Sequence, residues 1–510
     1  MTIRKFGRRW MLMGGGAALA LPALPSLLPA APRARAQPVA PPRRMVVITT
    51  RNGGLWNRHM HPPESAASEV LPHPLHDAHV GPLTSRVEDG DRIVSDVLRG
   101  PEDRFTEALL GKMNLIRGLD VPFYYGHCRH LLGNYGLMSS ESIDGAPDRE
   151  TSDQVLARTS LYDEVPRRRL MLFANRGLSI ELVDPRRGPE GGVQTAAEVG
   201  AQAIFDGVFV DADELDGGIG PIDAVLDGYR RVQSGAFGAG RRLSTEDRER
   251  LSLYMDQLSE LREASSSAVH ARCTTVRPRD DYELEMAPSP YNHLNYRNVN
   301  GIVLAGFLCD SSRIAVLRAD DPFTYTMEAD GGYHEVAHAA VTRDDAAHAT
   351  RLGGLLRDGA QRFFSQAVLD LVSRLDSVPE GDGTMLDHTL VWWGQESGPE
   401  THQGDSLPIL TIGSAGGRLT TGRYYDFRDR NARVLRDEEE ILAHEGRRAG
   451  ANFLQWHTTY LDAFDVPREA WQVEGRQAFS GSAPLQGFAP YDRAAHDASC
   501  AAPLPGLLAT

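Results

Sequence analysis

Short apolar runs typical of buried strands alternate with segments of helical periodicity along most of this chain. The first is Met-Val-Val-Ile-Thr-Thr at residues 45–50, which ends before Asn52, Gly53 and Gly54 and so predicts a buried strand followed by a turn. Further strands are predicted at residues 112–119, 168–173, 389–393 and 408–412, and buried elements at residues 300–308 and 314–317. Because strands that alternate with helices favour a mostly parallel sheet covered on both faces, we predict an α/β fold, a three-layer α/β/α sandwich.

The helical segments complete this picture and suggest one excursion from the sheet. Residues 151–157 resemble a helix start with Ser152 or Asp153 as its cap, and residues 346–375 and 452–464 form two later helices. Residues 219–231 and 244–262 are also periodic, and one helical face carries Leu251, Tyr254, Met255, Leu258 and Leu261. We therefore expect a helical insertion at about residues 205–290.

The first 36 residues have the pattern of an export signal. Arg8 and Arg9 precede an apolar stretch at residues 13–28, and a small-residue cleavage site, Ala-Arg-Ala, follows at residues 34–36. The paired arginines favour the twin-arginine route, and the stretch is shorter than the roughly 20 apolar residues that span a bilayer. We predict cleavage after Ala36 and a periplasmic or extracellular protein that does not span the membrane after signal removal.

The remaining chain divides simply. Residues 37–44 form a Pro-rich linker, residues 45–490 a single α/β domain, and residues 491–510 a C-terminal tail. Residues 60–105 are rich in Pro, His and Asp, so we expect an irregular loop. Five histidines lie in it or directly before it: His59, His61, His73, His76 and His79. They either sequester a metal or are solvated, and their irregular spacing favours a solvated loop.

Composition limits the classes of partner. The formal net charge of −15 argues against nucleic acid, which requires a basic face. The cysteines lie far apart, at positions 128, 273, 309 and 500, and their spacing does not select among the possible disulfides. The oligomeric state is open.

Polar residues gather where the predicted strands end, which is where open α/β sheets place their sites. His127 and Cys128 follow the second strand, Glu396 follows the strand at residues 389–393, and His402 lies shortly beyond it. Cys128 is either a nucleophile assisted by His127 or a disulfide partner. Asn52 is either a ligand or a turn residue that tolerates a left-handed backbone. Burying Glu396 alone would be costly, so pairing with a metal or an arginine is expected.

His334 and His338 are four residues apart, so on a helix their imidazoles share one face and suit a single metal ion. Glu335 between them completes His-Glu-x-x-His, the zinc-protease signature. The alternative is a pair of exposed helical histidines without a ligand.

The chain also resembles the HXXSHH family of exported bacterial proteins, which has no assigned activity. The similarity covers nearly the whole mature chain and rests on Arg8-Arg9, residues 48–53 with Trp56, His127, and residues 151–156, 309–313, 334–339, 381–394, His402, 407–408 and 413–417. Residues 381–394, Gly-Asp-Gly-Thr-Met-Leu-Asp-His-Thr-Leu-Val-Trp-Trp-Gly, belong to the most specific part. Ala337 and Ala339 replace the Ser and final His of the name-giving motif.

More distantly, residues 386–397 resemble the sulfatase and alkaline-phosphatase superfamily, in which a strand leads into metal-binding residues. Glu396 occupies a carboxylate position and Ser397 a histidine position, whereas Arg51 and Asn52 stand where that superfamily has two acidic ligands. The resemblance implies an alkaline-phosphatase-like fold, and Cys128 lacks the sulfatase context for conversion.

Two functions follow as hypotheses. The first is an exported, metal-dependent hydrolase of phosphate or sulfate esters, with small-molecule or polymer substrates. Its metal is zinc, manganese or iron, and the candidate ligands are Asn52, His334, His338, Glu396 and His402. His127 and Cys128 are its catalytic candidates. The second is a non-catalytic cell-envelope binding or assembly protein that keeps the fold without the activity. A zinc protease is a third, weaker interpretation.

Overall fold

The structure is a computed structural model, and it describes most of the central domain. The described residues are 11–14, 17–20, 41–121, 131–133, 150–159, 170–173, 178–184, 186–187, 191–196, 244–245, 248–256, 293–308, 312–319, 332–341, 346–401, 404–431, 448–473, 476–477, 499 and 501–509. His127, Cys128, His402 and the other three cysteines lie outside them, as does most of the predicted insertion at 205–290.

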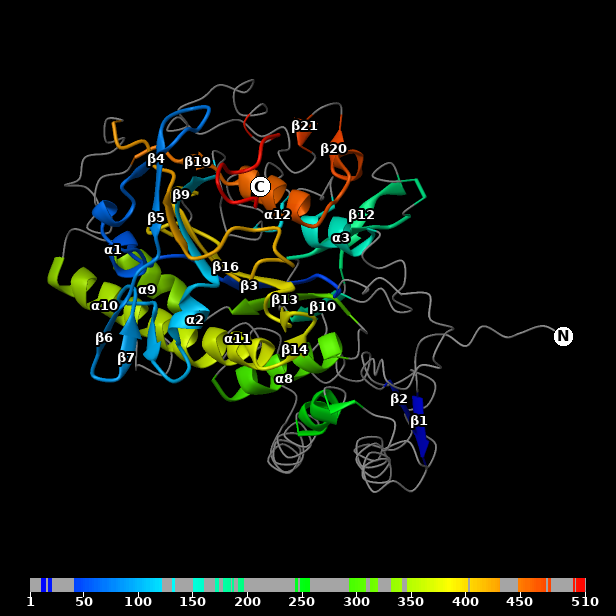
Figure 1. The fold of residues 1–510 in the computed structure, drawn as a ribbon. Helices are drawn as coiled ribbons and strands as arrows, with labels where there is room; N and C mark the ends of the chain where they lie inside the picture. The colour runs from blue at the N-terminus through cyan, green and yellow to red at the C-terminus, as the bar shows by residue number, and fades with distance from the viewer. Residues whose placement is uncertain are drawn as a thin grey trace, which may run out of the picture.

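A large mixed, mostly parallel sheet forms the centre of the molecule (Figure 1). Its strands run in the spatial order β10 (Leu170–Phe173), β13 (Ile314–Ala319), β3 (Arg44–Thr50), β16 (Thr389–Gln395), β17 (Leu407–Ile412), β9 (Met113–Asp120), β18 (Arg423–Asp426), β5 (Ala78–Pro82) and β4 (Glu69–Leu71), with β19 (Ala451–Asn452) beside β9. Strands β17 and β5 run against their neighbours, and the other neighbouring pairs are parallel. The predicted α/β class is confirmed.

Strand β3 shows why the sheet is covered on both sides. All seven of its residues are buried, and alternate side chains enter different cores. Val46 and Ile48 pack with one hydrophobic cluster, whereas Met45 and Val47 pack with the other. The strand begins at Arg44, one residue before the predicted domain boundary. The Arg44 guanidinium forms a buried bidentate ion pair with the Glu380 carboxylate, with distances of 2.7 and 3.0 Å.

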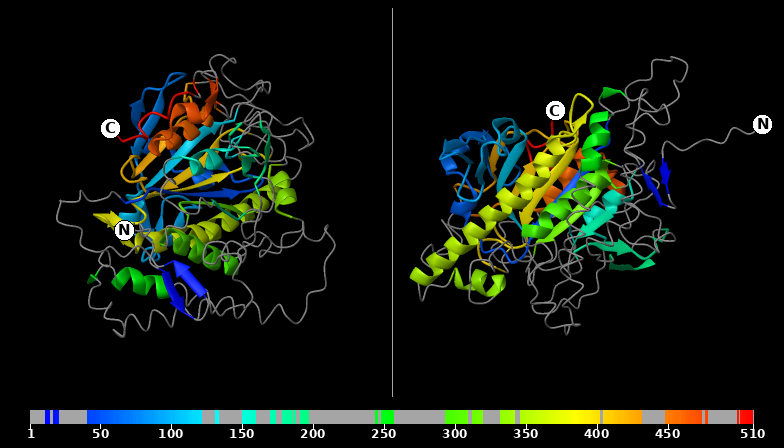
Figure 2. Two further views of the ribbon diagram at one scale, coloured as in Figure 1. Left: turned by 90° about the vertical axis from the view of Figure 1, so that its right-hand side faces the viewer. Right: turned by 90° about the horizontal axis from the view of Figure 1, so that it is seen from below.

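Helices lie on both faces of this sheet, an arrangement compatible with the predicted three-layer sandwich (Figures 1 and 2). One face is covered by α8 (His293–Leu308) and by a continuous rod of α10 (Ala346–Phe363), a π-helical turn (Phe364–Val368) and α11 (Leu369–Asp376). The other face carries α3 (Ser152–Ala157) and α12 (Leu454–Ala463). The predicted helices at 346–375 and 452–464 are therefore confirmed. Thr151, rather than Ser152 or Asp153, stands at the N-cap position of α3.

The π-helical turn has a specific polar partner on α8. A π-turn shifts backbone carbonyls away from their usual amide donors. The buried Asn300 side chain donates to the Ala367 carbonyl at 3.0 Å and to the Asp370 carboxylate at 2.9 Å. Asn300 thus joins two helices of the same layer.

Residues 60–105 correct the sequence-based expectation of an irregular, solvated loop. Strands β4 and β5 extend the main sheet, while β6 (Arg86–Glu88), β7 (Asp91–Ile93) and β8 (Arg99–Pro101) form a small antiparallel sheet. His59, His61 and His73 are buried rather than solvated. The strands are only three to five residues long, which is too short for their alternation to stand out from the surrounding Pro, His and Asp.

Shorter elements complete the described chain. They are β1 (Met11–Gly14), β2 (Ala17–Ala20), α1 (Asn57–Met60), a 3-10 turn (Glu64–Ala66), α2 (Glu107–Leu110), β11 (Ile180–Leu182), β12 (Val193–Thr195), α9 (Tyr333–Ala339), β14 (Pro379–Glu380), β15 (Gly383–Thr384), a 3-10 turn (Arg468–Ala470), β20 (Gln472–Val473) and β21 (Arg476–Gln477). Of the apolar face predicted for the helical insertion, Leu251, Tyr254 and Met255 lie within the described residues, and all three enter the core. Near the C-terminus, Leu504 and Leu507 are buried against the face that carries α12. No helix in the described ranges combines the length and apolar character needed to cross a bilayer.

Candidate functional site

Two turns meet at the carboxyl edge of the central strands. The turn after β3 contains Gly53 and Gly54, and the turn after β16 contains Glu396 and Gly398. The Glu396 amide donates to the Thr50 carbonyl at 2.9 Å, and the Gly54 amide donates to the Gly398 carbonyl at 3.0 Å. A Cβ on Gly53 would lie 2.4 Å from the Gly398 oxygen, so the close approach requires glycine. The turns after β3 and β16 therefore lie side by side at one edge of the sheet.

Asn52 begins the first of these turns in the left-handed backbone region, with φ of 68°. Its side chain is 5% exposed. Asparagine is one of the few residues that adopt this conformation readily, so the turn explains its presence. This agrees with the structural alternative that the sequence left open for Asn52.

Helix α9 packs directly on the turn after β3. The Tyr333 hydroxyl donates to the Gly53 carbonyl at 2.7 Å, and a Cβ on Gly54 would lie 2.8 Å from that of Ala337. Gly54 therefore allows the helix to lie against the sheet edge. This contact places His334 and His338 at the same edge of the sheet as Glu396.

The two histidines of α9 come together. Their Nε2 atoms are 3.1 Å apart, and the ring centroids are separated by 4.6 Å. His334 is partly buried and His338 is exposed, so the pair is open to solvent. Two ring nitrogens at this distance share either one proton or one metal ion, because two lone pairs facing each other would repel.

Glu396 is held in a buried ion pair. Its carboxylate Oε2 lies 3.1 Å from Nη2 of Arg318, and the two side chains are 0% and 2% exposed. Arg318 comes from β13 and Glu396 follows β16, so the pair spans the intervening strand β3. Of the two partners that the sequence allowed for Glu396, metal or arginine, the structure shows the arginine.

Asp405 is a buried carboxylate at this edge that sequence analysis did not single out. Its side chain is 1% exposed and it stands just before β17. The neighbouring Ser406 amide donates to the Asp120 carboxylate at 2.7 Å, which ties this turn to the end of β9. In a parallel sheet a residue before a strand lies at the opposite edge, so only the antiparallel direction of β17 brings Asp405 here.

The described residues do not assemble a complete metal site. Within them, no group of three or more His, Cys, Asp or Glu side chains is placed to hold an ion. His334 and His338 form a pair, and Glu396 is joined to Arg318. His127, Cys128 and His402 lie outside the described part of the chain, so their predicted roles stay predictions.

Comparison with known proteins adds no assignment. No family model, curated protein or solved structure matches this chain. The resemblances to the HXXSHH family and to the alkaline-phosphatase superfamily therefore stay predictions from the residues that suggested them.

Proposed function

We propose that this chain is an exported protein that binds a divalent metal ion through His334 and His338 at the edge of a hydrolase-like α/β sheet. The observation that carries the proposal is the 3.1 Å separation of their Nε2 atoms on α9. This separation is less than twice a zinc–nitrogen bond of roughly 2.0–2.1 Å, so one ion fits between both nitrogens. Imidazole ligands favour zinc, manganese or iron over calcium.

A metal at this position supports hydrolysis of phosphate or sulfate esters as the proposed activity. A bound ion would polarise the ester and lower the pKa of a bound water. The carboxyl edge of a largely parallel sheet is also where such folds carry their active sites. The predicted substrate is a small-molecule or polymer ester encountered after export.

One observation favours the non-catalytic alternative, a cell-envelope binding or assembly protein. Glu396 stands at the carboxylate position of the sulfatase-like resemblance, yet Arg318 holds it in a buried ion pair. A carboxylate compensated in this way has a structural reason to be present without any metal. Under this alternative the protein binds a metal at α9 but does not hydrolyse an ester.

Zinc titration of the purified protein tests metal binding. His334→Ala and His338→Ala should each weaken zinc at least about tenfold, because losing a ligand costs more than losing a second-shell contact, which costs about 10–100-fold. His348→Ala is the matched control, since His348 is an exposed histidine on the neighbouring helix α10. Equal zinc affinity in all three variants would remove the proposal.

Hydrolysis is tested separately on the metal-loaded protein with chromogenic phosphate and sulfate monoesters. Turnover that is lost together with zinc in His334→Ala supports the hydrolase. Zinc binding that depends on the two histidines, with no turnover of either ester class, supports the envelope-binding alternative.

A further inference from the structure

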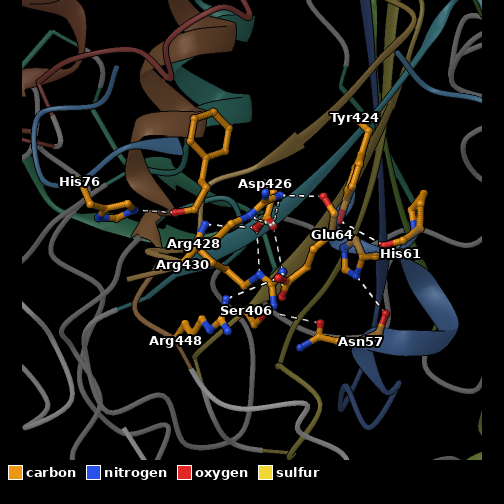
Figure 3. Close-up of polar contacts among 12 residues, drawn as sticks. Asn57, His61, Glu64, His76, Ser406, Tyr424, Asp426, Arg428, Arg430 and Arg448 are labelled. Carbon is orange, nitrogen blue, oxygen red and sulfur yellow. Dashed lines mark hydrogen bonds and ion pairs between the residues drawn. The ribbon is translucent and has the colours of Figure 1, made fainter. Parts of the chain in front are cut away.

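A second polar cluster lies around Asp426 (Figure 3). Asp426 is the last residue of β18, which runs parallel to β9. The Asp426 carboxylate, which is fully buried, accepts hydrogen bonds from Nε and Nη2 of Arg428 at 2.8 Å and from Nη2 of Arg430 at 3.0 Å. Glu64 accepts from Arg428 at 2.8 Å and from Arg448 at 3.5 Å. We call these five residues the Asp426 cluster.

The Asp426 cluster carries more positive than negative charge. Its three guanidinium groups face two carboxylates. Burial by itself would raise the pKa of Asp426, but Arg428 and the neighbouring arginines outweigh it and hold this pKa well below its usual range, so Asp426 stays ionised. The nearby Arg117, on β9, also acts electrostatically on Asp426 and on His61. The charges of these groups favour an additional anion.

His61 borders the Asp426 cluster and presents a hydrogen-bond acceptor. It is 4% exposed, and its Nδ1 lies 3.1 Å from the Asn57 carbonyl oxygen. A carbonyl only accepts, so Nδ1 carries the hydrogen and Nε2 carries a lone pair. Burial, with the charge of Arg117, lowers the pKa of His61 well below its ordinary value, so the ring is neutral at neutral pH. Among the described contacts, Nε2 has no hydrogen-bond partner.

Arg428 of the Asp426 cluster acts electrostatically on His61, so guanidinium donors and a lone-pair acceptor lie near one another, and together they select a particular kind of anion. Guanidinium groups donate to oxygens, whereas the His61 lone pair requires a group that donates a hydrogen. Hydrogenphosphate carries both charged oxygens and a hydroxyl. Fully ionised sulfate offers only oxygens, and its lone pairs would face that of His61.

We propose that the Asp426 cluster, together with His61, binds an oxyanion that retains a hydroxyl proton, of which inorganic phosphate is the simplest. The buried Asp426 and Arg428 form the fixed frame of this site. Glu64, Arg430 and Arg448 have side chains that are 40%, 18% and 26% exposed, so the cluster reaches solvent on their side. The inference is independent of the metal proposed at α9.

Calorimetric titration at about pH 8 with inorganic phosphate, sulfate and methyl phosphate tests the selectivity. Methyl phosphate has lost its last proton at this pH, because the second pKa of a phosphate monoester is about 6. Inorganic phosphate should therefore bind about tenfold or more tightly than both other anions, as expected for one hydrogen bond to a charged group. A sulfate or methyl phosphate affinity equal to that of inorganic phosphate would overturn the proposal and indicate a purely ionic site.

Two substitutions at His61 separate its acceptor from its structural bond. His61→Asn keeps an N–H donor near the position of Nδ1 and removes Nε2, so the preference for inorganic phosphate should disappear. His61→Gln places an amide near the position of Nε2 and should keep part of the preference. An unchanged preference in folded His61→Asn contradicts the role of this nitrogen.

Arg448→Gln keeps the test decisive if the His61 variants do not fold. Arg448 is partly exposed, and its loss should weaken inorganic phosphate and sulfate alike by several-fold. Arg86→Gln is the control, because Arg86 lies on β6 in an exposed ion pair with Glu88. If both variants bind like the parent protein, the anion does not occupy the Asp426 cluster.

Discussion

The buried Asp153 makes stability depend on pH in an unusual direction. Asp153 is the second residue of α3 and is fully buried. Ser179 donates to its carboxylate at 2.5 Å, and Gln154 in turn donates to the Ser179 hydroxyl at 2.9 Å. Burial outweighs these hydrogen bonds and raises the pKa of Asp153 from 3.8 to about 6.

The size of the effect follows from this shift. A carboxyl whose pKa is raised on folding binds its proton more tightly in the folded state than in the unfolded state. The stabilisation that this bound proton gives is complete below about pH 4 and is lost as the pH rises to about 6. The difference of about two pKa units corresponds to about 3 kcal/mol of unfolding free energy. Asp153 therefore opposes folding at neutral pH by about this amount relative to its protonated form.

Asp153→Asn isolates this contribution because the amide oxygen still accepts from Ser179 and the side chain cannot ionise. Urea unfolding of both proteins, followed by tryptophan fluorescence between about pH 4 and pH 7.5, measures the difference in unfolding free energy. That difference should move in favour of the variant by about 2–3 kcal/mol between the two limits. A difference that is constant with pH, or that moves the other way, would refute the assigned burial of the charge.

Two further predictions concern the sheet edge. Gly54→Ala should destabilise the protein more than Gly90→Ala, because the two glycines have nearly equal φ angles of +83° and +82° but only Gly54 lies against a neighbour, Ala337. Overpacking against Ala337 should make the loss of unfolding free energy about 1–3 kcal/mol larger for Gly54→Ala, as measured from urea unfolding midpoints. Equal losses in the two variants would show that α9 does not pack on this turn. Arg318→Leu should lower the unfolding free energy by about 3–5 kcal/mol, because Glu396 then stays buried without this arginine. Adding Glu396→Leu should recover part of this loss. A double variant that is less stable than Arg318→Leu alone would contradict the ion pair.

Local patterns determined much of the fold. The β-branched run at β3 and the apolar run at β16 are buried on both faces, so their central residues are consecutively apolar and predict strands without further information. The spacing of His334 and His338 likewise determined their pairing, because residues four apart on a helix always share a face. These features depend on neighbours in the sequence and were predicted correctly.

Partners distant in the sequence were decided only by the tertiary structure. Arg318 and Glu396 are 78 residues apart and meet because β13 and β16 flank the same strand. The antiparallel direction of β17 brings Asp405 to the carboxyl edge, and the burial of His61 beside Arg117 sets its neutral state. Charge compensation and burial depend on which strands pair and in which direction, and no local pattern in this chain contains that information.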